Sequence, residues 1–368
     1  MIGRTIVQEI EYPEVVNPQY LEQMLDTLPI IGDDDPKDPE WRATPIHEVD
    51  LTPFGYDAKI YVKDEADKRS NPTGTFKDRR AHENGPVRYS RFFRNLWKRR
   101  LQMTGQKIAI PRFSNLTAGN AGRAQAVMNE RFGLPPEKLL LDIATPEARI
   151  NQLMQLHADI YLAPLDSNIF TGKDGPYTPQ QILKLTNNVD GHDITSSRII
   201  DPQKDYYDWH WHEIFNESPD EVYGPYGSAE WFANGMTWQK ETANNIAGPS
   251  LDARLRVDPK IVLDISIFAA EPEDIEDSEA DKLTGMKPFV FYRDNDVQGM
   301  KALKMTGADT GKYSVSEGYL HFAHSILSRF VDCEVSAAAG LALFLKRYDQ
   351  GLTDPRKKVL IVNTGKGI

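Results

Sequence analysis

The sequence predicts an α/β fold built from mainly parallel β-sheets. Short apolar runs rich in β-branched residues have the length and composition of buried strands. Longer segments with helical spacing separate these runs, so that the two kinds of segment alternate along the chain. Such alternation favours mainly parallel strands joined by right-handed crossovers, with helices packed on the sheets.

Five runs are predicted as strands: Lys59–Lys63, Lys107–Pro111, Leu139–Ile143, Asp159–Ala163 and Lys358–Val362. The segment Ala121–Phe132 is predicted as a helix whose core-facing side carries Ala124, Val127, Met128 and Phe132. These spacings account for strands and helices but do not yet indicate a function.

Composition narrows the class of protein. A chain of 368 residues with 40% hydrophobic and 26% charged residues is long enough for roughly two globular domains. No apolar run is long enough to cross a bilayer, and glutamates occupy the N-terminal region where a signal peptide needs apolar residues. The net charge of −11 disfavours nucleic-acid binding, and the single cysteine, Cys333, cannot form an internal disulfide. We therefore expect a cytoplasmic protein without nucleic-acid or membrane partners.

The segment Asn71–Arg79 (NPTGTFKDR) departs most from generic α/β sequence. Its Pro-Thr-Gly turn leads directly into Lys77, which is predicted to begin a helix. The N-terminal dipole of a helix disfavours the charged form of a lysine, which is one way to obtain a nucleophilic amine able to form a Schiff base. The alternative interpretation is a surface lysine that simply follows a turn.

Two further segments place Gly and small polar residues beside a predicted strand. Ser114–Gly122 (SNLTAGNAG) is predicted as a strand-to-helix loop whose backbone N–H groups could bind a carboxylate or a phosphate. Asn363–Gly367 (NTGKG) follows the last predicted strand. Either segment alone could be no more than a tight turn that needs glycine.

In this order and spacing, the three segments resemble the fold-type II pyridoxal-phosphate (PLP) enzymes, the group of threonine synthase, cysteine synthase and tryptophan synthase β. The resemblance extends over most of the chain and implies two open, twisted, mainly parallel sheets flanked by helices. It also includes Ala43–Ile46, Lys59–Glu65, a loop at Gly224–Glu230 and the helical segment Glu334–Leu341. The lysine motif NPTGTFKDR is most similar to that of threonine synthase.

The resemblance implies that PLP is the cofactor and assigns residues to it: Lys77, Asn120, Gly227, Ser228, Ala229 and Thr364. Lys77 would form the Schiff base and act as the general base at the substrate Cα. Asn120 would bond the phenolic oxygen of the pyridine ring, and Thr364 would face the ring nitrogen. The loop with Gly227 would hold the phosphate, although Ala229 stands where the family usually has glycine. Glu230 is expected to point away along the first helical turn.

The resemblance also assigns the substrate carboxylate to one loop. Thr117, with the backbone N–H groups of Ala118 and Gly119, would bind the carboxylate of an amino-acid substrate beside Asn120. Arg79, Arg112 and Arg123 flank these motifs and are candidates to bind an anionic substrate tail.

A domain organisation and a reaction follow from the same resemblance. Residues 1–83 and 167–368 would form a large cofactor-binding domain, and residues 84–166 a small mobile domain, with the active site in the interdomain cleft. The predicted function is elimination or replacement on an amino acid, as in threonine synthase. The alternatives are β-replacement on an activated serine, as in cysteine synthase, and a non-catalytic relative that binds a metabolite or partner. A homodimer is expected from the family.

Two other features remain open. His210 and His212 lie two residues apart in DWHWHE, a spacing that could contribute to a metal site on a strand, but no third ligand is evident, and no metal is predicted. Residues 88–107 are basic with interleaved aromatic residues, which is typical of an amphipathic helix with a solvated basic face or, alternatively, a surface for an acidic partner.

Overall fold

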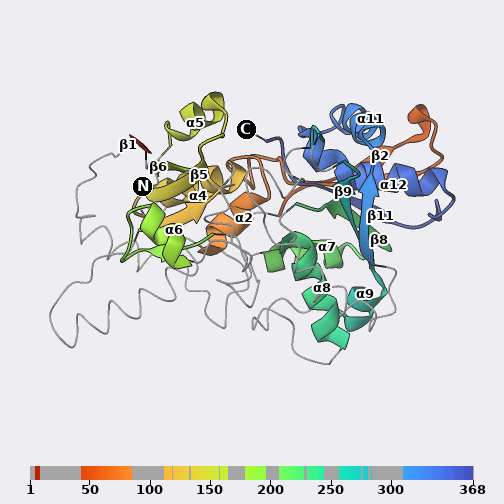
Figure 1. Cartoon of the computed structure of the whole chain (residues 1–368). Coiled ribbons are helices and arrows are strands. Elements are labelled where there is room, and N and C mark those ends of the chain that lie inside the picture. The colour runs from red at the N-terminus through yellow and green to blue at the C-terminus, as the bar shows by residue number, and fades with distance from the viewer. Residues whose placement is uncertain are drawn as a thin grey trace. The chain divides into compact units, whose positions relative to one another are not determined.

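The computed structural model describes residues 5–8, 43–84, 112–117, 119–131, 134–156, 158–164, 179–195, 207–227, 230–243, 257–274, 277–280, 283 and 310–367 (Figure 1). The chain forms two compact units. Unit 1 contains Lys77–Ile200 together with the N-terminal strand, and unit 2 contains Trp41–Phe76 and Asp201–Gly367. The predicted basic helix at 88–107 and the predicted strand Lys107–Pro111 lie outside the described residues.

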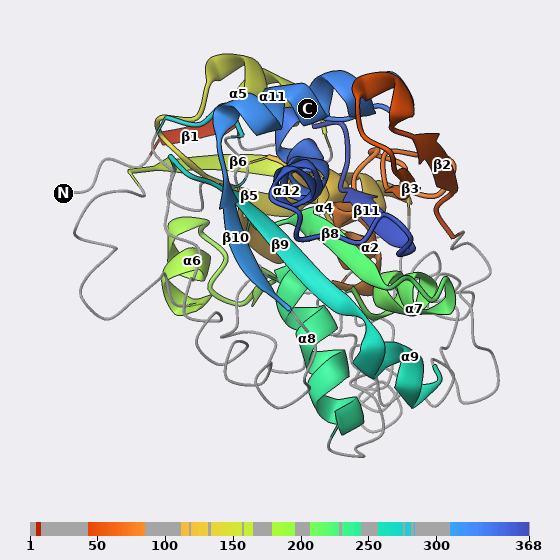
Figure 2. The same cartoon turned by 90° about the vertical axis from the view of Figure 1, so that its right-hand side faces the viewer.

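Unit 2 is built on a six-stranded sheet, which Figure 2 shows with its strands side by side from β10 to β2. In spatial order the strands are β10 (Gly311–Val315), β9 (Ser266–Pro272), β8 (Glu221–Pro225), β11 (Val359–Asn363), β3 (Lys59–Asp64) and β2 (Ile46–Asp50). All neighbouring strands are parallel except β2, which pairs antiparallel with β3 at one edge. The carboxyl ends of the five parallel strands therefore lie along the same edge of the sheet.

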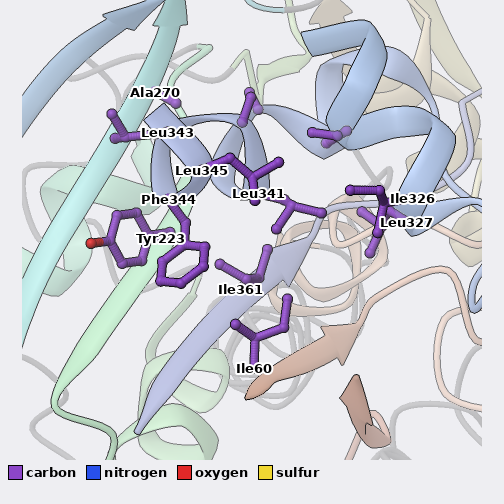
Figure 3. Close-up of a cluster of buried hydrophobic side chains, with 14 of the residues drawn as sticks. Ile60, Tyr223, Ala270, Ile326, Leu327, Leu341, Leu343, Phe344, Leu345 and Ile361 are labelled. Carbon is purple, nitrogen blue, oxygen red and sulfur yellow. The ribbon is translucent and has the colours of Figure 1, made fainter. Parts of the chain in front are cut away.

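Both faces of this sheet are buried, and alternate strand residues enter different cores. In β11, Val359 and Ile361 pack in one cluster, whereas Leu360 and Val362 pack in another. Figure 3 shows Ile361 and Ile60 of the first cluster facing Leu341 and Phe344. Because side chains alternate across a strand, burial on both faces requires the continuous apolar run seen in the sequence.

The helices of unit 2 supply the other half of each core. The first cluster receives residues from α11 (Glu317–Leu327), η4 (Val335–Ala338) and α12 (Ala339–Asp349). The second receives residues from α7 (Asp208–Asn216), α8 (Glu230–Ala243) and α9 (Pro259–Asp264). A short 3-10 helix, η1 (Thr52–Phe54), joins β2 to β3.

Unit 1 contains a five-stranded sheet (Figure 1). In spatial order its strands are β1 (Thr5–Gln8), β6 (Ala158–Ala163), β5 (Glu137–Asp142), β4 (Phe113–Leu116) and β7 (His192–Asp193). The strands are parallel except β1, which pairs antiparallel with β6 at the edge.

Helices cover both faces of this smaller sheet. Ala126 of α4 (Asn120–Arg131) and Leu153 of α5 (Glu147–Leu153) pack in one cluster with Leu139 and Leu141 of β5. On the other face the end of α6 (Pro179–Leu185) approaches β4, where the Thr186 hydroxyl is hydrogen-bonded to that of Ser114 (2.7 Å). A further short helix, α2 (Lys77–His82), packs against α4.

The fold prediction is confirmed: both sheets are mainly parallel and flanked by helices. Four predicted strands correspond to β3, β5, β6 and β11, and the predicted helix corresponds to α4. On its predicted core face, Ala124 and Met128 are buried and Val127 is half-buried, whereas Phe132 lies outside the described residues.

One boundary is wrong. Residues Ser114–Leu116, predicted as loop, form the end of β4. The sequence conceals this strand because Ser114 and Asn115 are polar. Both are nevertheless fully buried, and Asn115 Nδ2 donates to Glu137 Oε2 at 3.4 Å.

The boundaries between the units follow residues 40, 76 and 200, whereas the predicted boundaries follow residues 83 and 166. The division into a large cofactor-binding domain and a small mobile domain stays a prediction. Among the described helices, none is long and apolar enough to span a membrane.

Candidate active site

The carboxyl edge of the six-stranded sheet brings three of the quoted motifs together in unit 2. Strands β3, β11 and β8 are neighbours and run parallel. Glu65 follows β3, Thr364 follows β11, and Gly227 lies two residues beyond β8. Ligands of open α/β sheets usually bind outside the carboxyl ends of the strands, which makes this edge the candidate site of unit 2.

The turn that precedes Lys77 is fixed by backbone hydrogen bonds on this edge. Gly74 N–H donates to Asn71 O (2.8 Å), closing the turn. Phe76 N–H donates to Thr364 O (3.0 Å), and Lys366 N–H donates to Gly74 O (3.2 Å). Lys77 is the next residue after Phe76 and begins α2, as the sequence predicts. The NTGKG segment therefore packs directly against the lysine turn.

Gly365 shows how closely the two segments approach. Its φ is +140°, and a Cβ at this position would lie 2.7 Å from Gly74 O. Both its conformation and this approach exclude an ordinary side chain. Glycine is thus required here for backbone packing, without reference to any ligand.

The second loop of this edge connects β8 to α8. Tyr226 N–H donates to Ala270 O (2.7 Å), which holds the start of the loop against β9. Gly227 is half-buried, whereas Ser228 and Ala229, the other residues assigned to the phosphate, lie outside the described residues. Glu230 begins α8, as expected for an acid in the first turn, and is buried.

Two hydroxyl groups make this edge suitable for a cofactor such as PLP. The Tyr226 hydroxyl is buried and has no hydrogen-bond partner among the described residues. Thr364 is 6% exposed, and no hydrogen bond joins its hydroxyl to another described residue. A buried donor without a partner costs free energy unless a ligand satisfies it. Tyr226 lies in the loop that leads into α8, and a helix N-terminus suits a phosphate. The Thr364 hydroxyl is a neutral group that suits a pyridine nitrogen.

The substrate residues assigned from sequence lie in unit 1, where β4 leads into α4. Thr117 Oγ1 accepts hydrogen bonds from the N–H groups of Gly119 and Gly122, both at 3.1 Å. Gly119 has a φ of +145° and Asn120 is the first residue of α4, while Ala118 lies outside the described residues. The Gly119 N–H would therefore have to exchange its bond to Thr117 for a substrate carboxylate.

The three candidate arginines differ in their contacts. Arg112 forms an ion pair with buried Asp159 (2.5 Å) and donates to Pro136 O (2.8 Å), so it is not an unpaired cation. Arg79 is buried in α2 and has partners of its own. Arg123 is half-buried on α4, one turn from Asn120, and no ion pair joins it to another described residue.

The histidine pair does not have the geometry that a metal site on a strand requires. His210 and His212 lie on α7, where residues two apart point to different sides. His210 is fully buried, whereas His212 is half-buried. Among the described residues, no group of three or more His, Cys, Asp or Glu side chains could hold a metal ion.

Comparisons with known proteins agree with this architecture. No family model matches the chain, and no curated protein matches it in sequence. Solved structures do match, and they show that the chain has the fold of the fold-type II PLP-dependent enzymes.

Three of these structures illustrate the likeness. Serine racemase from Dictyostelium discoideum is 17% identical with a TM-score of 0.61, over 89% of this chain and 93% of that chain. A PLP-dependent aspartate racemase is 14% identical with a TM-score of 0.58, over 98% of each chain. Diaminopropionate ammonia lyase from Escherichia coli, in complex with an aminoacrylate–PLP azomethine intermediate, is 13% identical with a TM-score of 0.57. The match covers 99% of this chain and 94% of that chain.

Sequence reasoning missed two residues of this edge. Tyr226 lies within the loop Gly224–Glu230, where a tyrosine in a turn after a buried strand is the signal in the sequence that indicates it. Glu65 ends the quoted segment Lys59–Glu65, and its fully buried carboxylate could not be predicted from its local sequence.

Proposed function

We propose that the protein is a PLP-dependent enzyme acting on an amino acid, with Lys77 holding the cofactor covalently. The observation that carries the proposal is the lysine turn, in which NPTGTF is hydrogen-bonded to the loop after β11 and delivers Lys77 as the first residue of α2. The fold shared with PLP-dependent enzymes supports it.

We assign different roles to the residues of the proposed site. Lys77 would move the proton at the substrate Cα, and Thr117 with Gly119 would bind the substrate carboxylate. Asn120 would orient the pyridine ring, and the neutral hydroxyl of Thr364 would face its nitrogen without forcing protonation. Gly227, Ser228 and Ala229, at the N-terminus of α8, would bind the phosphate, with Tyr226 as an added donor. When bound, the cofactor would supply carbanion stabilisation.

Borohydride reduction after incubation with PLP, followed by peptide mass mapping, tests the attachment. We expect one modified peptide, containing Lys77. Lys77→Ala should abolish the modification, whereas Lys59→Ala, on an exposed strand position, should leave it unchanged. Modification at another lysine, or none, would contradict the proposal and favour a non-catalytic relative that binds a metabolite or partner.

For the reaction itself we propose elimination or replacement of the threonine synthase type, with β-replacement on an activated serine as the alternative. A phosphorylated substrate tail needs a cation, because like charges repel strongly in a low-dielectric site. Of the three candidate arginines, only Arg123 has no partner among the described residues. We therefore assign the tail to Arg123.

Cofactor absorption during titration with O-phosphohomoserine or O-acetylserine distinguishes the two reactions. We expect the phosphorylated compound to change the spectrum at lower concentration. Arg123→Ala should weaken its binding by more than about tenfold, the loss of a charge-assisted hydrogen bond. Arg329→Ala, which removes an exposed charge in unit 2, is the control. A response to O-acetylserine alone would favour β-replacement. We also propose a homodimer, which sedimentation would test.

A further inference from the structure

Helix α7 carries the DWHWHE segment, for which the proposed function has no use. Its inward side chains enter a polar cluster in unit 2 that is buried beneath the lysine turn. The cluster is formed by Thr44, Lys63, Glu65, Asn71, His210 and Glu213. These residues come from three distant parts of the sequence, and they include four ionisable side chains.

Glu65 is the centre of this cluster. Its Oε1 accepts a hydrogen bond from the Thr44 hydroxyl (2.7 Å) and lies 3.0 Å from Nδ1 of His210. Its Oε2 accepts a hydrogen bond from Asn71 Nδ2 (2.9 Å). Both carboxylate oxygens are therefore held, and the fully buried side chain has no freedom to rotate.

Lys63 and Glu213 link the cluster to a second position on α7. Lys63 Nζ donates to Glu213 Oε2 (2.6 Å) and to Thr44 Oγ1 (2.7 Å), and lies 3.8 Å from Glu65 Oε1. Two carboxylates thus share one ammonium group, and one of them, Glu65, also lies against the imidazole of His210. A network of this kind is rigid because each member restricts the position of the others.

The cluster contacts the lysine turn at its first residue. Asn71 Nδ2 donates to Glu65 O as well as to Glu65 Oε2, both at 2.9 Å. Asn71 O in turn accepts the Gly74 N–H that closes the turn. The orientation of Asn71, and with it the path of the turn, is therefore set by Glu65.

The residue that precedes α7 contacts the turn at its last residue. Tyr207, immediately before α7, is stacked on Phe76 with ring centroids 5.0 Å apart and an interplanar angle of 19°. Phe76 precedes Lys77, so the backbone of Lys77 starts one peptide bond, about 3.8 Å between Cα atoms, from this contact. The residue that precedes α7 thus contacts the last residue of Asn71–Phe76, and α7 reaches the first residue through Glu65.

We propose that Glu65 is a positioning residue for Lys77, and that α7 acts on the lysine through Glu65 and Tyr207. The importance of Lys77 itself rests on the proposed function. Glu65 does not touch the reacting atoms. It fixes Asn71, and thereby the direction in which the turn delivers the lysine.

Hydrogen exchange of the free protein tests the proposal without any cofactor. In Glu65→Gln, which keeps the shape but removes the charge, the amides of Gly74 and Phe76 should exchange at least about tenfold faster, as expected for loss of a hydrogen bond to a charged group. Amides of the β11–β8 ladder serve as the reference and should change less.

A control variant separates positioning from general stability. Gln239→Leu removes two buried hydrogen bonds, to Val262 O and Ile265 O, at a distant position of α8. It should accelerate the turn and the ladder amides equally. If Glu65→Gln does the same, the role is purely structural and the proposal is wrong. If Glu65→Gln does not fold, Thr44→Val replaces it, because it removes one hydrogen-bond donor to Glu65. Thr44→Val should accelerate exchange of the turn amides more than that of the ladder amides, by a smaller factor than Glu65→Gln. No such selective acceleration would overturn the proposal.

A second readout concerns the lysine itself. Competitive acetylation compares the reactivity of Lys77 with that of exposed Lys59 in the same molecule. This ratio should increase in Glu65→Gln and stay constant in Gln239→Leu, and an unchanged ratio in Glu65→Gln would contradict the proposal. Selective effects in a protein whose Lys77 takes up no PLP would support the positioning role while refuting the proposed function.

Discussion

Each unit contains a cluster of two carboxyl groups and a buried basic side chain, but the protein supplies hydrogen-bond partners to the two clusters very differently. In unit 2 both oxygens of Glu65 have partners, and Lys63 lies within 4 Å of Glu65 and Glu213. In unit 1, Arg80 is buried near Glu137 and Asp193. There, one carboxyl oxygen of each acid has no hydrogen-bond partner among the described residues.

This difference appears in the pKa values of unit 1. Burial raises the pKa of Glu137 well above its usual value, and the Asn115 and Arg80 side chains offset only part of that increase. Burial likewise raises the pKa of Asp193 to about 6, against the opposing hydrogen bonds from Thr195. In unit 1 the donors are therefore too few to offset burial, because a buried carboxylate is stabilised only where enough donors surround it.

The largest effect should come from breaking the paired cluster. Lys63→Met leaves the buried Glu65 and the half-buried Glu213 without their ammonium partner, so we expect the free energy of unfolding to fall by about 3–5 kcal/mol. Lys59→Met is the matched control on the same strand, because its ion pair with Glu48 is exposed and is expected to contribute less than about 1 kcal/mol. Urea denaturation measures both, and equal losses would show that the buried pairing is unimportant.

Removing a charge from unit 1 should increase the free energy of unfolding at neutral pH, in contrast to Lys63→Met. With a folded-state pKa of about 6 against 3.8 for the free group, the folded chain binds more protons than the unfolded chain between these values. The contribution of Asp193 to stability is therefore present at low pH and lost as the pH rises through about 6. Relative to wild type, Asp193→Asn should gain about 3 kcal/mol between pH 3 and pH 7, from roughly two pKa units.

Denaturation at several pH values checks this prediction. Asp190→Asn, which removes an exposed carboxylate three residues earlier, is the control and should follow the wild-type pH profile. If the difference in free energy of unfolding between Asp193→Asn and wild type does not depend on pH, Asp193 is better solvated than its burial indicates.

The smallest expected difference between the units is between two helix glycines, one in each unit. A Cβ on Gly340, in α12, would lie 2.8 Å from the backbone oxygen of Tyr223, which cannot move alone. A Cβ on Gly122, in α4, would lie 2.8 Å from a methyl group of Thr117 and 2.9 Å from one of Leu139, both on side chains. We expect alanine to cost about 3 kcal/mol at Gly340 and about 1 kcal/mol at Gly122.

Thermal unfolding of the two variants measures this difference. Gly318→Ala is the control, because its Cβ would meet only Ser316 Oγ at 3.9 Å and the substitution should stabilise α11 by about 0.5–1 kcal/mol. If Gly122→Ala loses more stability than Gly340→Ala, the side-chain contact at Gly122 is more rigid than the backbone contact at Gly340, contrary to expectation.

The sequence by itself determined the α/β class, four of the strands, helix α4 and the position of the lysine turn. These features are local: strands buried on both faces need apolar runs, and a lysine that begins a helix after Pro-Thr-Gly is visible in a few residues. It did not reveal β4, because Ser114 and Asn115 are polar residues whose burial depends on partners elsewhere in the fold.

Only the tertiary structure decided which charges are paired. Lys63 meets Glu213 across 150 positions of sequence, and Arg80 donates to Ile194 O across 114. The role of α7 was hidden for the same reason, since the position of His210 in DWHWHE gives no sign of Glu65. The local sequence pattern indicates which residues can be buried. The pKa and the free-energy contribution of a buried charge depend on its neighbours in space, and these are fixed only when the strands come together.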